Sequence, residues 1–229
     1  MGDSVERNAR RGPFLAWPVI AGSAVLLGLL IAYPPFRIVA KSTGAISATH
    51  ASTGVATAIA FEPAVFAIKL WDEKLAPAAA RAPEAEVLLA DLGRDPVSAV
   101  KAHAHRVGLG NAAYYFVRGT GRVMAVERSR LIIQIDGTTV ALRTGPVFGN
   151  VVRDGCGLLD VNQVPGLTEF NALSAELNRL VEERVQPGLK TGVAVGVTVT
   201  FAGCAEAPET LPSGGPLLTF IPISAEVRP

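Results

Sequence analysis

The spacing of apolar and polar positions changes along the chain, from a helical period to a strand period. Between residues 61 and 110, apolar residues recur at near-helical spacing, which predicts amphipathic helices. Pro63 and Pro96 each follow an acidic residue and suit the first position of a helix, because that position needs no amide partner. A further short helix is predicted over residues 84–92. We expect this part of the chain to form a small helical domain.

From residue 111 onward, apolar and polar residues alternate with the period of two that is typical of β-strands. Residues 112–126 predict one long strand, in which Gly119 and Gly121 mark a bend of the kind found at barrel corners. Asp136-Gly137 is a strong hairpin signal. The other strands are predicted at residues 131–135, 140–142, 147–152 (a short one), 193–201 and 217–227. Pro222, inside the last strand, must face an edge or a bulge.

An amphipathic helix is predicted over residues 167–186, within this run of strands. Its apolar face carries leucines such as Leu173 and Leu177, and Pro187-Gly188 is expected to end it. A bent first strand, a meander, a helix and a closing pair of strands follow the order of the five-stranded OB barrel. The predicted fold class is therefore α+β, mainly β, with an OB-like barrel over residues 111–229 and the small helical domain 61–110 beside it.

The N-terminal part contains an apolar stretch long enough to span a bilayer. No charged residue occurs over the 25 positions 12–36, and about 20 helical residues cross the hydrocarbon core. Trp17 and Tyr33 lie near its two ends, where amphipathic rings suit the headgroup region. We therefore expect one transmembrane signal anchor at residues 12–36. A cytoplasmic N-terminus (residues 1–11) precedes it, and a flexible tether rich in small residues (residues 37–60) follows it.

Basic residues around this stretch predict its orientation. Three arginines precede it and two basic residues follow it closely, which favours a cytoplasmic N-terminus and an extracytoplasmic C-terminal part. The chain is thus expected to be a single-pass protein of the cell membrane. Two other interpretations stay open, a cleaved secretory signal and a buried helix of a soluble protein. The length of the apolar stretch, and the prolines where cleavage would fall, argue against a cleaved signal.

Composition narrows the classes of function. The 229 residues include 21 basic and 20 acidic side chains, and this net charge of +1 excludes the electrostatic footprint of a dedicated nucleic-acid binder. Hydrophobic residues make up 49% of the chain, which argues against a mostly disordered protein. Two cysteines are too few for a disulfide scaffold or a thiolate-rich metal site.

No motif predicts catalysis or a cofactor. Residues 108–113 match the G-x-G-x-x-A dinucleotide pattern, but a predicted helix precedes them and a strand follows, whereas pyrophosphate binding needs the reverse order. His103 and His105 are two positions apart and diverge on a helix, so they cannot share a metal ion. We therefore predict no catalytic, cofactor-binding or metal-binding residues, and a protein that is not an enzyme.

Two local features each leave an alternative open. Arg153-Asp154 follows a predicted strand, and an ion pair that stabilises the loop is the simpler interpretation. Recognition of an anion or a sugar by Arg153 is the other. Cys156 and Cys204 both lie beside glycines at predicted strand ends, and a disulfide between them can persist outside the cytoplasm. Two small buried thiols are the alternative.

Several short motifs follow one another in a distinctive order. They are Trp71-Asp72-Glu73-Lys74-Leu75, His105-Arg106-Val107-Gly108-Leu109-Gly110-Asn111, Gly119-Thr120-Gly121-Arg122-Val123, Gly145-Pro146 and Arg153-Asp154-Gly155-Cys156-Gly157. Together they resemble the "predicted periplasmic lipoprotein" family, a domain of unknown function numbered 2291, over nearly all of residues 61–227. The resemblance implies an OB-like barrel with a small helical domain. It also implies an extracytoplasmic, membrane-attached protein, often encoded beside sugar ABC transporters of the ribose type.

The resemblance transfers no catalytic residue, because none is established for the family. At most it marks a shared structural or binding feature, formed by Trp71, Asp72, His105, Arg106, Asn111, Arg153 and Asp154. The chain lacks the family's lipid-accepting cysteine, which leaves anchorage to the uncleaved helix. It also carries cysteine at positions 156 and 204, near which the family typically has a small residue such as alanine. This paired change favours a disulfide.

The expected function is that of a non-enzymatic, membrane-anchored accessory module. The expected partner is the permease or the solute-binding protein of a sugar ABC transporter. Binding of a sugar or oligosaccharide on the barrel face is the first alternative. Sugar sites usually need aromatic platforms, for which Tyr114, Tyr115 and Phe116 are the candidates. An envelope hydrolase is the second alternative.

Overall fold

The computed structural model describes residues 61–107 and 112–228. The expected cytoplasmic N-terminus, anchor (residues 12–36) and tether (residues 37–60) lie outside these ranges, as does Asn111. Across the two described ranges, no helix is both long and apolar enough to cross a bilayer.

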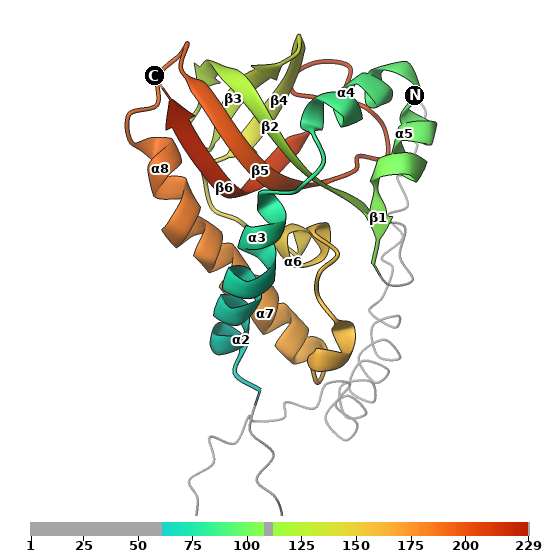
Figure 1. The fold of residues 1–229 in the computed structure, drawn as a ribbon, viewed down its shortest axis with the longest axis vertical. Coiled ribbons are helices and arrows are strands. Elements are labelled where there is room, and N and C mark those ends of the chain that lie inside the picture. Colours follow the sequence, from blue (N-terminus) through green and yellow to red (C-terminus); the bar gives the residue numbers. More distant parts are fainter. Residues whose placement is uncertain (1–60, 108–111, 229) are drawn as a thin grey trace, which may run out of the picture. The chain divides into compact units, whose positions relative to one another are not determined.

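Five strands close into a barrel (Figure 1). They are β2 (Ala113–Val126), β3 (Arg130–Ile135), β4 (Thr138–Arg143), β5 (Thr198–Glu206) and β6 (Thr219–Arg228). The strand order is β2-β3-β4-β6-β5, and β5 pairs with β2 again, so the sheet closes on itself. The β4–β6 pair is parallel and the other barrel pairs are antiparallel. The predicted five-stranded OB-like barrel is confirmed; a two-residue strand, β1 (His105–Arg106), extends the sheet beside β2.

The length and the bend of β2 allow the barrel to close. Residues 114–122 of this strand pair with β5, and residues 122–126 pair with β3. At Gly121 a Cβ atom would lie 2.9 Å from the carbonyl oxygen of Gln134, and at Gly119 it would lie 2.8 Å from the Cβ of Ala85. Both glycines predicted to mark a bend therefore stand where the strand approaches its neighbours too closely for a side chain.

Two turn predictions are confirmed. Asp136 (φ +47°) and Gly137 (φ +84°) form the two-residue connection between β3 and β4, and both adopt the positive φ that such a hairpin turn requires. Pro222 lies in β6 where the register against β5 shifts between Ala202 and Gly203. Its missing amide hydrogen therefore falls at an irregular point of the ladder, as expected for proline in a strand.

Helices pack on two sides of the barrel. They are α2 (Pro63–Leu70), the π-helical turn η1 (Trp71–Leu75), α3 (Ala76–Ala79), α4 (Ala85–Arg94), α5 (Pro96–His103), α6 (Val151–Gly155), the 3-10 turn η2 (Val161–Gln163), α7 (Leu167–Leu180), the π-helical turn η3 (Val181–Val185) and α8 (Gln186–Lys190). The predicted helix starts at Pro63 and Pro96 are confirmed. In Figure 1, α2, α6 and α7 lie below the barrel, whereas α4 and α5 lie beside its upper right part.

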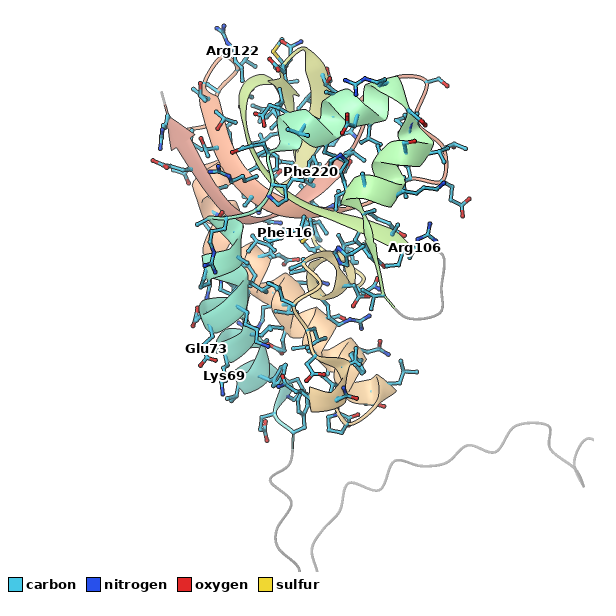
Figure 2. All side chains as sticks on the ribbon, turned by 45° about the vertical axis from the view of Figure 1, so that its right-hand side comes forward. Lys69, Glu73, Arg106, Phe116, Arg122 and Phe220 are labelled. Atoms are coloured by element: carbon cyan, nitrogen blue, oxygen red, sulfur yellow. The ribbon has the colours of Figure 1, made fainter. Side chains whose placement is uncertain are left out.

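Two hydrophobic cores lie on opposite faces of β5 and β6. The barrel core fills the barrel and includes Phe220 and Leu92 of α4. The helix core lies between the outer face of these strands and the helices below, and includes Ile221 and Leu177 of α7. Successive residues of a strand point to opposite faces, so Phe220 and Ile221 enter different cores. Figure 2 shows Phe220 within the barrel and Phe116 at its lower edge, where it packs against the helix core.

The helices of residues 63–103 do not form the separate small domain that the sequence predicted. Leu92 of α4 packs into the barrel core, whereas Trp71 of η1 packs into the helix core. These helices share both cores with the barrel and have no core of their own, which a separate domain would need. The structure therefore shows no division between the helices of residues 61–107 and the barrel, and the described residues 61–107 and 112–228 belong to one compact unit.

The expected helix end at Pro187 is also wrong, because the helix continues through η3 into α8. In η3 the amide of Gln186 bonds to the carbonyl of Val181, five residues back. This wider turn accommodates Pro187, which has no amide hydrogen and whose ring would clash in a regular helix. The turn η1 repeats the arrangement directly before Pro77.

Two strand predictions differ from the structure for a common reason. Residues 147–152 form a loop and the start of α6, and the strand predicted over residues 193–201 begins only at Thr198. Gly149 (φ +82°) and Gly196 (φ +97°) adopt backbone angles that an extended strand does not allow. Apolar alternation thus occurs where there is no strand, at residues 147–152, and before the strand begins, at residues 193–197.

Candidate functional site

The structure brings together four of the seven residues that the family motifs mark, namely His105, Arg106, Arg153 and Asp154. His105 and Arg106 lie on β1, and Arg153 and Asp154 lie on α6. All four line a hollow of about 520 Å³. This part of the predicted feature is therefore a real spatial cluster.

Two other marked residues, Trp71 and Asp72, lie elsewhere. Trp71 is buried in the helix core. Asp72 accepts a hydrogen bond from Arg184 of η3, with 2.7 Å between Oδ1 and Nη1. Both side chains of this pair are exposed, and exposed pairs contribute about 0–1 kcal/mol. Trp71 and Asp72 therefore help to pack α2 and η1 against α7 and η3, while Asn111 lies outside the described residues.

The Arg153–Asp154 pair is close to fully buried, with 14% and 7% of the side chains exposed. The guanidinium Nε and Nη2 atoms donate to the two carboxylate oxygens at 2.6 and 2.7 Å. Its Nη1 atom donates to the hydroxyl of Ser174 at 3.0 Å and to the carbonyl of Phe170 at 3.3 Å. Because its donors are used within the chain, the geometry favours the ion-pair interpretation of Arg153 over recognition of an anion. The pair joins α6 to α7.

Three more polar side chains surround this ion pair. Asn150 donates both to the carboxylate of Asp154 and to the hydroxyl of Tyr114, the latter at 3.1 Å. His105 lies with Nε2 at 2.5 Å from the carbonyl oxygen of Asp154. Burial raises the pKa of Tyr114, and the hydrogen bond from Asn150 opposes that shift. We call these three residues, together with Arg153 and Asp154, the Asp154 cluster.

The two cysteines lie next to each other. Their sulfur atoms are 3.7 Å apart, and both are free thiols. Cys204 on β5 is fully buried, and this burial raises the pKa of its thiol. A Cβ atom on Gly155 would collide with the side chain of Cys204, so the close approach of α6 to β5 depends on this glycine. The disulfide stays a prediction, and the proximity of the two sulfur atoms supports it.

Phe148 is an aromatic side chain that the fold leaves in solvent, with 80% of its surface exposed. It stands between two hollows, of about 550 Å³ and 460 Å³, and lines both. The first hollow faces α7, and its polar side chains include Asn150, Asn171, Asn178, Arg179 and Glu182. The second faces the loop after β5 and is lined by Arg143, Glu206, Thr210 and Thr219 among others. We call them the Phe148 hollows.

The loop that carries Phe148 is held in place by side chains of the helix that runs from α7 to α8. Hydrogen bonds run from the Val147 amide to Glu182 (2.7 Å), from Asn178 to the Gly149 carbonyl (2.9 Å) and from Gln186 to the Gly145 carbonyl (2.7 Å). The exposure of Phe148 is therefore imposed by the structure around the loop.

The aromatic residues proposed from the sequence do not form a platform on the barrel face. Tyr114 and Tyr115 are buried, and Phe116 packs against the helix core. Sequence reasoning missed Phe148. The available signal was an aromatic residue in a loop bounded by Gly145-Pro146 and Gly149, since exposed loops supply many binding residues.

His103 and His105 make separate local contacts. Nε2 of His103 lies 2.7 Å from Oδ2 of Asp91, and His105 belongs to the Asp154 cluster. Within residues 61–107 and 112–228, no three His, Cys, Asp or Glu side chains converge as a metal site would require.

The fold has a counterpart among solved structures. An OB-fold protein of Thermotoga maritima shares 23% sequence identity with this chain and superimposes with a TM-score of 0.65. The match covers 73% of this chain and 99% of the other. At this identity the similarity establishes the fold alone. No curated protein matches the chain.

A family model matches most of the sequence. It covers residues 26–225 and is described as "Predicted periplasmic lipoprotein (DUF2291)". The match spans all but the last three residues of the barrel, its helices and part of the predicted anchor. It agrees with the resemblance that the ordered motifs carry. The chain belongs to the predicted periplasmic lipoprotein family, DUF2291.

Proposed function

We propose that this chain is a membrane-attached, extracytoplasmic accessory module that assists a sugar-uptake system by binding and not by catalysis. The description of its family as periplasmic lipoproteins supports the compartment and the membrane attachment. The uncharged residues 12–36 support a helical anchor, because neither of the two cysteines lies near the N-terminus to accept a lipid. The observation that carries the binding role is Phe148, which stands exposed between two hollows on a firmly held loop.

The exposure of Phe148 is energetically unfavourable for the isolated chain. Burying a phenylalanine side chain contributes about 1.5–3 kcal/mol, and Phe148 forgoes most of that with 80% of its surface in water. Aromatic side chains that fill a pocket dominate the binding energy of protein interfaces. A loop already ordered by three hydrogen bonds loses little entropy on association. Phe148 therefore has the properties of an interface anchor.

The membrane attachment can be tested with a reporter enzyme that works only outside the cytoplasm. Fused after Pro229 of the full chain, it is expected to be active, and the fusion is expected to sediment with membranes. The physical reason is the partitioning of the uncharged residues 12–36 into the bilayer. A matched chain without residues 12–36 should remain in the soluble fraction. Activity of a cytosolic reporter alone, or a full-length chain that stays in solution after ultracentrifugation, would contradict the proposal.

Replacing Phe148 by alanine should weaken partner binding without unfolding the protein. We expect the free energy of unfolding to change by about 0.5 kcal/mol or less, since the ring makes few contacts. Recovery of the permease or the solute-binding protein of a sugar transporter with the full chain should fall about tenfold or more. The measurement is quantitative co-purification from solubilised membranes.

Leu167→Ala provides the matched control for Phe148→Ala. Leu167 is an apolar side chain on α7 with 76% of its surface exposed, and it lines neither of the Phe148 hollows. This variant should leave both stability and partner recovery unchanged. Equal recovery with the Phe148→Ala and parent chains would remove Phe148 as the anchor.

Direct sugar binding is the second candidate, and one observation favours it. The Phe148 hollow beside α7 combines an aromatic ring with the side-chain amides of Asn150, Asn171 and Asn178. Its volume of about 550 Å³ suits a small ligand. Such a site would lie beside α7 and not on the barrel face. A calorimetric sugar screen distinguishes the two candidates. A heat of sugar binding that is present with the parent chain and absent with both Phe148→Ala and Asn171→Ala would favour direct sugar binding. Turnover of an envelope substrate by the purified chain would contradict both.

A further inference from the structure

Another hollow, of about 230 Å³, lies between α4, α5, β1 and the loop after β5. Its walls are mainly apolar and include Leu92, Val97 and Val100. Val97 leaves 66% of its surface in water, so an apolar wall is open to a small molecule. Figure 2 shows Arg106 at the outer side of β1, where it lines this hollow. The hollow is separate from the proposed function, which rests on Phe148.

Tyr115 is among the residues that line this hollow, and its hydroxyl group has no hydrogen-bond partner among the described residues. The residue is fully buried, and its oxygen makes no hydrogen bond among the described residues. The neighbouring Tyr114 differs, because its hydroxyl accepts a hydrogen bond from Asn150. Burial raises the pKa of Tyr115, so the hydroxyl keeps its proton and can donate. A buried polar group without a partner is unfavourable, and phenylalanine would avoid that penalty at this position.

Two cations stand at the same hollow. Lys101 on α5 and Arg106 on β1 are exposed and line it, and neither forms an ion pair with a described residue. Glu209 is the one carboxylate among the lining residues. Positive charge therefore exceeds negative charge where the hollow meets water, which favours an anionic group there. The apolar walls exclude a ligand that is charged throughout.

We propose that this hollow binds a small aromatic carboxylate that carries a hydrogen-bond acceptor on its ring. The ring packs against Leu92, Val97 and Val100, and the carboxylate remains at the solvent side near Lys101 and Arg106. The ring substituent accepts a hydrogen bond from the hydroxyl of Tyr115. Each feature of the ligand is thus set by one feature of the hollow: its apolar walls, its cations and its unpaired donor.

Titration of the full chain in detergent with 4-hydroxyphenylacetate tests the proposal. We expect saturable binding by calorimetry, and binding of phenylacetate that is about tenfold weaker, because phenylacetate leaves the Tyr115 hydroxyl unpaired. Tyr115→Phe should remove this difference between the two acids. In Tyr114→Phe, the matched control, the tenfold preference should persist, since that hydroxyl is bonded to Asn150.

Removing the two positive charges at the hollow gives a second, independent test of the proposal. The double variant Lys101→Gln/Arg106→Gln should bind 4-hydroxyphenylacetate about tenfold more weakly than the parent chain. Its affinity for the neutral analogue 4-hydroxyphenethyl alcohol should be unchanged. Thermal melting shows that each variant is folded, and Tyr115→Phe should melt no earlier than the parent chain. No saturable binding at millimolar 4-hydroxyphenylacetate, or an unchanged preference in Tyr115→Phe, would overturn the proposal.

Discussion

Replacing Asp154 by alanine is expected to lower the free energy of unfolding by about 3–5 kcal/mol, the range found when one partner of a buried ion pair is removed. The carboxylate is 7% exposed and accepts two hydrogen bonds from Arg153, and one from Asn150. Its loss leaves the guanidinium group of Arg153, only 14% exposed, without a counter-charge. Denaturant unfolding measured by circular dichroism gives the change directly.

Asp72→Ala is the matched control for Asp154→Ala. Asp72 also pairs with an arginine, Arg184, at 2.7 Å, but on the surface, and its removal should lower stability by about 1 kcal/mol or less. The combined variant Arg153→Met/Asp154→Leu should lose less of the free energy of unfolding than Asp154→Ala alone, since it removes both charges. If Asp154→Ala and Asp72→Ala were equally stable, the Asp154 cluster would not stabilise the joint between α6 and α7.

Oxidation is expected to join Cys156 to Cys204 and to raise the free energy of unfolding by about 4 kcal/mol, according to the chain-entropy model. The sulfur atoms lie 3.7 Å apart in the folded chain, and the two residues are 48 positions apart in the sequence. The disulfide therefore restricts a long segment of the unfolded chain. Cys156 is the accessible partner, because Cys204 is fully buried. Unfolding with and without reductant, after incubation with oxidised glutathione, measures the difference.

Cys156→Ala supplies the control for oxidation, since this chain cannot form the bond. Its stability should not respond to reductant, and mass spectrometry of the parent chain should show the loss of two hydrogen atoms after oxidation, which oxidised glutathione takes up as it is reduced to two thiols. Two free thiols recovered from the folded parent chain after prolonged oxidation would show that the pair remains reduced. An intermolecular dimer as the main product would also contradict the prediction.

Most of the barrel could be predicted from the sequence because its signals are local. The bend glycines of β2, the hairpin at Asp136-Gly137 and the bulge at Pro222 each follow from the backbone angles that one residue allows. The helix starts at Pro63 and Pro96 are equally local, because proline fixes its own φ angle.

The predictions that failed concern places where packing overrides local preference. Proline at position 187 ends most helices, but here the π-helical turn η3 removes the clash. The apolar alternation around Val193 predicts a strand, yet Val193 packs against the barrel core from a loop. The same limit explains the missing helical domain. An apolar helix face does not specify which surface will cover it, and α4 and α2 cover different cores.

The candidate site, too, could be predicted from the sequence only in part. The ordered motifs marked His105, Arg153 and Asp154 correctly as residues that lie together. They did not distinguish these residues from Trp71 and Asp72, which pack elsewhere. The order of motifs along the chain does not specify which residues lie close together in the folded protein. Phe148 carried no motif at all.

The sequence by itself determined the barrel, its turns and the apolar segment of residues 12–36, because each depends on neighbours along the chain. Only the tertiary structure decided that Phe148 is exposed and that Tyr115 keeps an unpaired hydroxyl. Exposure and pairing are properties of a side chain and its distant neighbours. Phe148 is held outward by residues of α7, η3 and α8 that lie 29 to 41 positions from their main-chain partners. Contacts of that separation exist only after the chain has folded.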